Sequence, residues 1–284
     1  MGARGHRFLV LAVASVILAA CAETSGQPSK EPPGEAPATN RYGANATVLD
    51  DGGGPELCLG AVAESLPPQC GGMPILGWRW EDVDGEQTRG SVTWGDYHVV
   101  GTYDGSAFTV ESAGPIVPTE PGEGNPFESP CSEPEGGWTD VDPSRTSDDD
   151  RIAAMHEAED VPEYAGIWIS YLQEPVDFEI PGPYVLNAAF TGDPHRFESA
   201  LRGVWGGPLC LLSFDRTHRE LVRVQRELEG VADSMGFELL WSSVDVIDNE
   251  VELGIVVAEP RIEAALAEAY GEGTVRIVPA LQPV

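Results

Sequence analysis

The sequence is poor in basic residues, and it contains a single lysine, Lys30. Sixteen Lys and Arg residues stand against 47 Asp and Glu residues, which gives a formal net charge of −31. A surface this acidic repels nucleic acid and anionic lipid headgroups, so we exclude both as charge-driven partners. The chain nevertheless has 42% hydrophobic residues and seven Trp residues, a composition typical of a folded protein.

Recognisable catalytic motifs are also missing. The sequence has no Gly-x-Ser-x-Gly, no His-Glu-x-x-His, no phosphate-binding glycine-rich motif and no Cys-x-x-Cys. We therefore expect no cofactor and no metal. Acidic residues between positions 140 and 150 offer the oxygen ligands that Ca²⁺ takes, but they lack the glycine and distal glutamate of an EF-hand loop, and a solvated acidic linker explains them better.

No apolar run reaches the roughly 20 residues that a spanning helix needs. The run from Phe8 to Ala20 follows Arg4 and Arg7 and ends in Leu18-Ala19-Ala20-Cys21, the layout of a secretory signal peptide. This ending resembles the lipobox of bacterial lipoproteins. The resemblance implies cleavage before Cys21, acylation of its sulfur, and a protein anchored by lipid on the extracytoplasmic face of the cell membrane. The alternative is an ordinary secreted protein in which Cys21 is coincidental.

The other four cysteines form an even set, which in an exported chain indicates two disulfides with three ways of pairing. Cys58 and Cys70 bracket a short loop, so we pair them, and Cys131 is left to pair with Cys210. A zinc site is the competing interpretation, but the spacing does not favour it.

The composition divides the mature chain into four parts. Residues 21–45 are rich in Pro and Gly and predict a flexible tether. Residues 46–116 predict about five short strands, the last two joined at Asp104-Gly105, and hence a small disulfide-stapled β-barrel or sandwich. Residues 117–150 read as an acidic Pro/Gly-rich linker, at whose end Ser147 could cap a helix beginning near Asp148.

Residues 151–284 predict an α+β domain. The stretches Val185 to Phe214 and Val251 to Leu281 each contain a strand, an acidic-Pro pair, a helix, an aromatic-Gly stop and a last strand, so each is a β-α-β repeat. From Leu209 onward the order is β-α-β-β-α-β. We therefore expect a ferredoxin-like domain whose single sheet is extended by the strand from Tyr184.

Three tryptophans in the first domain suggest a binding surface. Trp78 and Trp80 are two residues apart, so in a strand they share one face, and Trp94 lies on a later strand. An exposed aromatic face could stack on sugars or on another protein, although such residues in a small barrel are more often core.

Several stretches look like uncharacterised lipoproteins and secreted proteins of high-GC Gram-positive bacteria. They run from Leu57 to Gly60, from Pro67 to Gly72, through Tyr103-Asp104-Gly105, and from Gly206 to Cys210. The resemblance implies location and architecture but no activity. We expect a lipid-anchored envelope protein that binds or scaffolds an envelope protein or carbohydrate, without catalysis. The alternative is a hydrolase of carbohydrate or cell wall that uses paired carboxylates.

Overall fold

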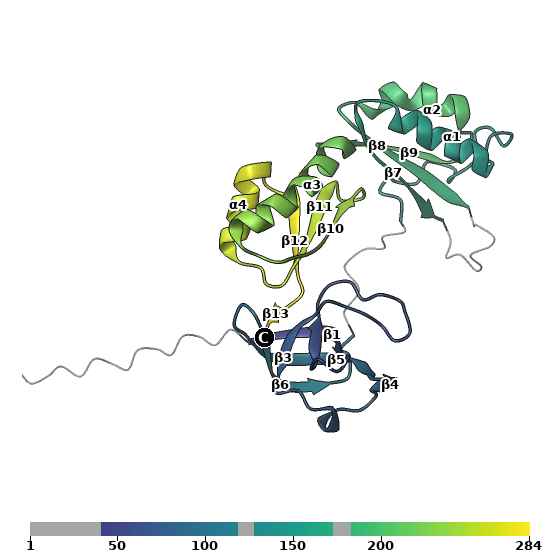
Figure 1. Cartoon of the computed structure of the whole chain (residues 1–284). Helices are drawn as coiled ribbons and strands as arrows, with labels where there is room; N and C mark the ends of the chain where they lie inside the picture. Colours follow the sequence, from purple (N-terminus) through teal and green to yellow (C-terminus); the bar gives the residue numbers. More distant parts are fainter. Residues whose placement is uncertain (1–40, 119–127, 173–182) are drawn as a thin grey trace, which may run out of the picture. The chain divides into compact units, whose positions relative to one another are not determined.

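The computed structural model describes residues 41–118, 128–172 and 183–284 (Figure 1). The expected signal peptide, Cys21 and most of the expected tether lie outside these residues. Within them, no helix combines the length and the apolar character that a membrane span requires. All described residues belong to one unit of the chain, Asn40–Val284.

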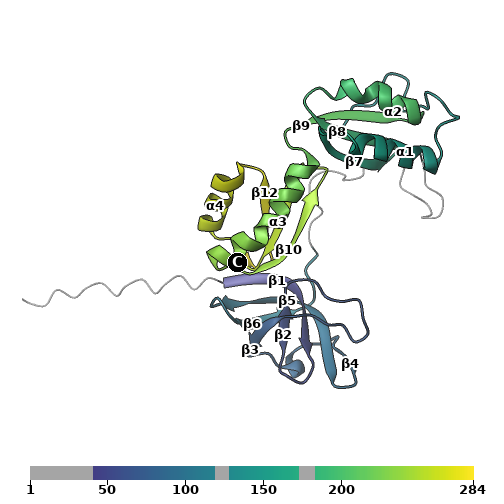
Figure 2. The same ribbon diagram turned by 45° about the horizontal axis from the view of Figure 1, so that its top comes forward.

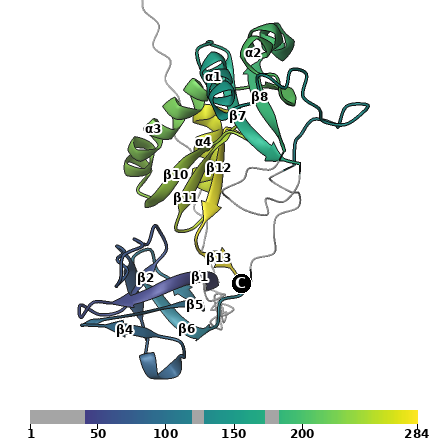
Figure 3. The same cartoon turned by 90° about the vertical axis from the view of Figure 1, so that its right-hand side faces the viewer.

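The first sheet has seven strands, one of which comes from the end of the chain. They are β1 (Arg41–Asp50), β2 (Glu56–Cys58), β3 (Met73–Leu76), β4 (Gln87–Arg89), β5 (Val92–Tyr103), β6 (Phe108–Gly114) and β13 (Gln282–Pro283). Pairings run from β1 through β2, β3, β6 and β5 and return to β1, so five strands pair in a ring. β13 pairs with β1 through Tyr42 and Pro283, and the two strands lie side by side in Figure 3.

Local sequence signals explain how this sheet turns. The expected hairpin joins β5 to β6, and Gly105 takes a positive φ of +99° at its tip. The Asp104 carboxylate accepts hydrogen bonds from the backbone N–H groups of Ser106 and Ala107. Apolar side chains of the ring strands form one core, including Val48, Leu57 and Phe108.

The rest of the described chain builds the same unit twice. The first copy comprises α1 (Asp148–Glu159), β7 (Tyr164–Tyr171), β8 (Tyr184–Thr191), the short η2 (Pro194–Phe197), α2 (Glu198–Val204) and β9 (Leu209–Phe214). The second comprises α3 (His218–Met235), β10 (Leu239–Asp245), β11 (Glu250–Ile255), α4 (Pro260–Tyr270) and β12 (Val275–Pro279). In each copy the first two strands pair antiparallel and the last two pair parallel.

Each copy packs its two helices against its own three-stranded sheet. In the first copy, α1 and α2 lie on one side of the sheet (Figure 1). Ala154 of α1 and Leu201 of α2 share a buried cluster with Leu186 and Phe190 of β8. In the second copy, α3 lies beside β10 and α4 beside β12 (Figure 2). Leu221 and Leu228 of α3 and Ile262 of α4 pack against β11. The repeat therefore includes a helix and a strand ahead of the β-α-β segment that the sequence shows.

The mixed α+β class is confirmed, but the expected single ferredoxin-like sheet is wrong for the described strands. β9 pairs with β8 along its whole length, from Leu186–Leu209 to Thr191–Phe214, and belongs to the first copy. β10, β11 and β12 form a separate sheet. The reason is that β8, α2 and β9 form a parallel crossover, which returns β9 to the strand that precedes it rather than to the strands that follow.

Helix boundaries follow capping signals in the sequence. At α1 the Ser147 hydroxyl accepts from the Asp150 N–H, and the Asp150 carboxylate accepts from the Ser147 N–H. Thr217 and Glu220 form the same reciprocal pair at α3. α3 ends at Gly236, whose φ of 69° is left-handed, as helix-terminating glycines commonly are.

Candidate functional site

Both expected disulfides are present. Cys58 and Cys70 are bridged with a Cα–Cα distance of 5.9 Å, and Cys131 and Cys210 with one of 5.8 Å. The first bridge lies in a small cluster beside Trp94. The second attaches the segment after the first sheet to β9 of the first α/β copy.

The tryptophans do not form the exposed binding face that the sequence suggested. Trp78 and Trp94 are buried, with 9% and 7% of their surface exposed, and they belong to different clusters. Trp80 is half-buried and meets the Trp78 ring edge-on at 5.4 Å. The physical reason is that β3 ends at Leu76, so Trp78 lies in the loop that follows and Trp80 begins the short 3-10 helix η1 (Trp80–Asp82). Both rings pack inward against Tyr97 rather than outward along a strand.

Residues 128–147, which we call the docked segment, are held against the first α/β copy. The backbone N–H groups of Val141 and Asp142 donate to the Gly206 carbonyl at 2.7 and 3.0 Å, and the Gly206 N–H donates to the Arg145 carbonyl at 2.7 Å. Nearer its start, the Ser129 hydroxyl donates to the buried Asn187 side chain at 2.8 Å. The docked segment is therefore fixed at both ends and by the Cys131–Cys210 bridge.

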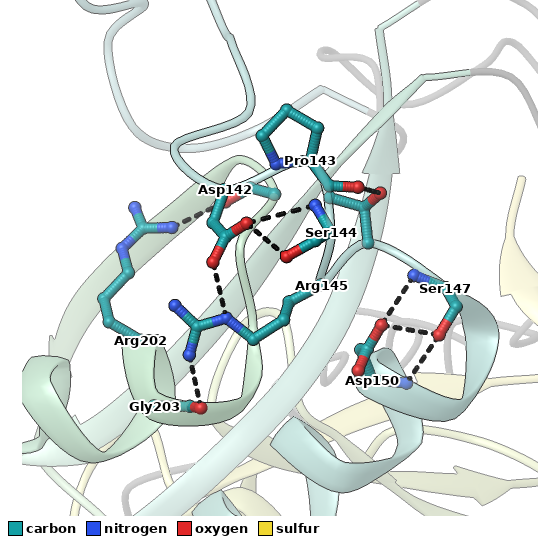
Figure 4. A network of polar contacts seen from close by, with 10 residues as sticks. Asp142, Pro143, Ser144, Arg145, Ser147, Asp150, Arg202 and Gly203 are labelled. Carbon is teal, nitrogen blue, oxygen red and sulfur yellow. Dashed lines mark hydrogen bonds and ion pairs between the residues drawn. The ribbon is translucent and has the colours of Figure 1, made fainter.

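The carboxylates of this region serve turns and caps. Asp142 accepts from the Ser144 backbone and hydroxyl and from the Arg145 guanidinium, while Asp150 caps α1 with Ser147 (Figure 4). Hydrogen bonds from Ser144 lower the pKa of Asp142, and those from Ser147 lower the pKa of Asp150. Among the residues that the structure describes, no three His, Cys, Asp or Glu side chains gather as metal ligands would.

Two of the histidines sit on the surface beside a glutamate of their own helical turn. The His156 ring lies 3.7 Å from the Glu159 carboxylate, and the His195 ring lies 3.3 Å from that of Glu198. His218 differs from these two because it lines a hollow.

That hollow, which we call the α3 groove, has a volume of about 600 Å³ and lies between α3 and the chain that joins α1 to β7. Its apolar part is Val161, Pro162, Tyr164 and Val222, and its polar part is Glu159, His218, Arg219, Arg223, Arg226 and Glu227. The Tyr164 and His218 rings lie 5.5 Å apart at its wall. A mostly apolar hollow of this size with a few convergent polar groups is the usual form of a small-molecule site.

The groove concentrates positive charge in an acidic chain. Arg219, Arg223 and Arg226 are exposed and lie on successive turns of α3, away from its buried apolar face. Arg223 pairs with Glu227 at 3.1 Å, whereas Arg219 and Arg226 make no ion pair with any described residue.

Tyr164 contributes a neutral phenol to the groove. Burial of its side chain, reinforced by the nearby Glu159 carboxylate, raises its pKa to about 12. Near neutral pH its hydroxyl is therefore protonated and can donate a hydrogen bond.

Sequence reasoning misses this groove, because the apolar period of α3 indicates only which face of the helix is buried and leaves its arginines as ordinary surface residues. The signal was present, since three arginines at i, i+4 and i+7 are conspicuous in a chain with so few basic residues. The contribution of Tyr164 and Val161 depends on tertiary contacts that the sequence does not reveal. Comparison with known protein families and with curated proteins finds no match to this sequence.

Proposed function

We propose that this chain is a lipid-anchored extracytoplasmic protein that binds a ligand or partner at the cell envelope, without catalysis. The observation that carries the proposal is the pair of disulfides, Cys58–Cys70 and Cys131–Cys210. Disulfides persist in oxidising compartments outside the cytoplasm, and the lipobox-like Leu-Ala-Ala-Cys21 supplies both a route to such a compartment and an anchor there.

The architecture supports a binding role. The ring of strand pairings favours a small barrel over a sandwich for the first domain, because a sandwich leaves its sheet edges unpaired. The Cys131–Cys210 bridge and backbone hydrogen bonds fix the docked segment against the first α/β copy, and the α3 groove offers a preformed hollow. A rigid protein with a preformed hollow loses little conformational entropy on binding.

The alternative of a hydrolase needs two carboxylates facing each other across a cleft. The α3 groove contains Glu159 and Glu227, but each is engaged by a neighbour on its own helix, His156 and Arg223 respectively. This arrangement favours binding over acid–base chemistry there.

The proposed lipid anchor is tested by expressing the full chain and its Cys21→Ser variant in a high-GC Gram-positive host fed a clickable palmitate analogue. We expect the wild type to be labelled and recovered with membranes, and the variant to be neither labelled nor retained. Ser25→Ala, four residues past Cys21, serves as the control and should behave as wild type. An unlabelled wild type, or a variant that stays with membranes, would overturn the proposed anchor.

A further inference from the structure

We propose that the α3 groove binds a small organic anion, whose charged head group contacts Arg219 and Arg226 and whose apolar body rests on Tyr164 and Val222. The inference rests on the proposed binding function and names the ligand class of its site. It depends on three features of the groove: two guanidinium groups, those of Arg219 and Arg226, that form no ion pair with a described residue; a small net charge; and an apolar wall.

The described contacts reveal no structural role for the row of arginines formed by Arg219, Arg223 and Arg226. Arg219 and Arg223 are four residues apart, and Arg226 is three further on, so like charges occupy neighbouring turns of α3. Such spacings destabilise a helix. The chain has 47 acidic residues with which to neutralise them, yet of these three arginines only Arg223 forms an ion pair within the described chain. A bound anion would compensate the repulsion between the arginines.

The net charge of the groove limits the anion. Three guanidinium groups and two carboxylates, those of Glu159 and Glu227, leave a single excess positive charge when His218 is neutral. This balance suits one carboxylate, sulfonate or phosphodiester group. A polyphosphate or an acidic polymer would be repelled by the two glutamates and by the acidic surface around the groove.

The apolar wall of the groove indicates what kind of body the ligand has behind its charged head group. Val161, Pro162, Val222 and the Tyr164 ring offer a surface on which an aromatic or aliphatic body can lie, and the volume of about 600 Å³ fits a small molecule. The His218 ring lies beside this surface, 5.5 Å from the Tyr164 ring, and its nitrogen atoms can add a hydrogen bond to the head group. The groove therefore matches an amphipathic anion better than an inorganic one.

The test compares two fluorescent probes with the same ring system. Anilinonaphthalene sulfonate carries one negative charge and phenylnaphthylamine carries none. Each is titrated into the full chain carrying Cys21→Ser with both disulfides formed, so that no lipid is present whether or not the wild type is acylated. We expect the sulfonate to bind more tightly than the neutral probe and to weaken as salt is added.

The decisive variant is Arg219→Gln/Arg226→Gln. It should weaken sulfonate binding about tenfold, because charge-assisted hydrogen bonds are lost, and it should leave the neutral probe unchanged. The matched control is Arg89→Gln/Arg196→Gln, which removes the same charge from two exposed positions that make no ion pair within the described chain. All four arginines are exposed, so both variants should keep the wild-type circular dichroism spectrum and melting temperature.

Two results would overturn the inference: a sulfonate that binds no more tightly than the neutral probe, or equal sulfonate affinity in the two double variants. Neither result depends on acylation, so evidence against the anion site would not count against the proposed lipid anchor. Conversely, if Cys21 proves not to be acylated, the probe titrations still decide what the groove binds.

Discussion

Replacing Gly206 by alanine should release the docked segment. Gly206 lies in the turn between α2 and β9, where it faces the backbone of Asp142. A Cβ atom on Gly206 would overlap the Asp142 carbonyl oxygen and lie 2.9 Å from the Asp142 Cβ. Neither obstacle is the movable end of a side chain, so the two backbones must separate.

The magnitude follows from the three backbone hydrogen bonds at this contact. The Gly206 carbonyl accepts from Val141 and Asp142, and the Gly206 N–H donates to Arg145. A net value of about 1 kcal/mol for each predicts that Gly206→Ala lowers the free energy of unfolding by about 2–4 kcal/mol. Urea denaturation followed by tryptophan fluorescence measures the loss. Limited proteolysis should show new cleavage within residues 128–147.

Gly203→Ala is the matched control. Gly203 lies three residues earlier, in α2, and a Cβ there would meet no atom within 4 Å. Alanine is the better helix former, so this variant should be neutral or more stable by up to about 1 kcal/mol. If Gly206→Ala unfolded at the same urea concentration as wild type and its docked segment stayed protected from protease, the close contact would not hold the segment in place.

Two further predictions concern the bridges and the groove. The bridges close loops of 79 and 12 residues, so chain entropy predicts that removing Cys131–Cys210 costs about 4.5 kcal/mol and removing Cys58–Cys70 about 3 kcal/mol. Urea midpoints of the two paired Cys→Ala variants in the opposite order would contradict this. Because burial raises the pKa of Tyr164 to about 12, the protonated phenol contributes its full stabilisation of the fold below pH 10. This stabilisation is lost as the pH rises through about 12. Tyr164→Phe should therefore reduce the alkaline loss of stability by about 1 kcal/mol, given partial solvent screening, and an unchanged loss would refute the burial.

Features encoded within a few neighbouring residues could be predicted. The cap at Ser147, the hairpin at Asp104-Gly105 and the helix stop at Gly271 all follow from local backbone chemistry. The disulfide pairing was also predictable, because only four cysteines remain after Cys21 and two of them flank one short loop.

Features that depend on residues far apart in the sequence could not be predicted. Alternation along a strand tells which residues share a face, but it does not tell what covers that face. Trp94 is buried in a small cluster with Leu49 and Cys58, apart from the core that contains Trp78. The β-α-β repeat indicates β8 as the partner of β9, but the order of elements does not tell whether the strands after β9 join the same sheet. That order, read from Leu209, matches a ferredoxin-like sheet, yet β8 lies before it and takes it as a neighbour.

The docked segment shows why composition alone underestimates order. Pro, Gly and acidic residues dominate it, so it has few apolar side chains to bury and its sequence is typical of a linker. Its attachment instead uses backbone groups, which every residue carries: the N–H groups of Val141 and Asp142 and the carbonyl of Arg145. Such an attachment needs a partner residue that lets the backbone of the docked segment approach closely. Gly206 does so because it has no side chain. The stretch from Gly206 to Cys210 thus holds the docked segment twice, through a close backbone contact at its first residue and a disulfide at its last.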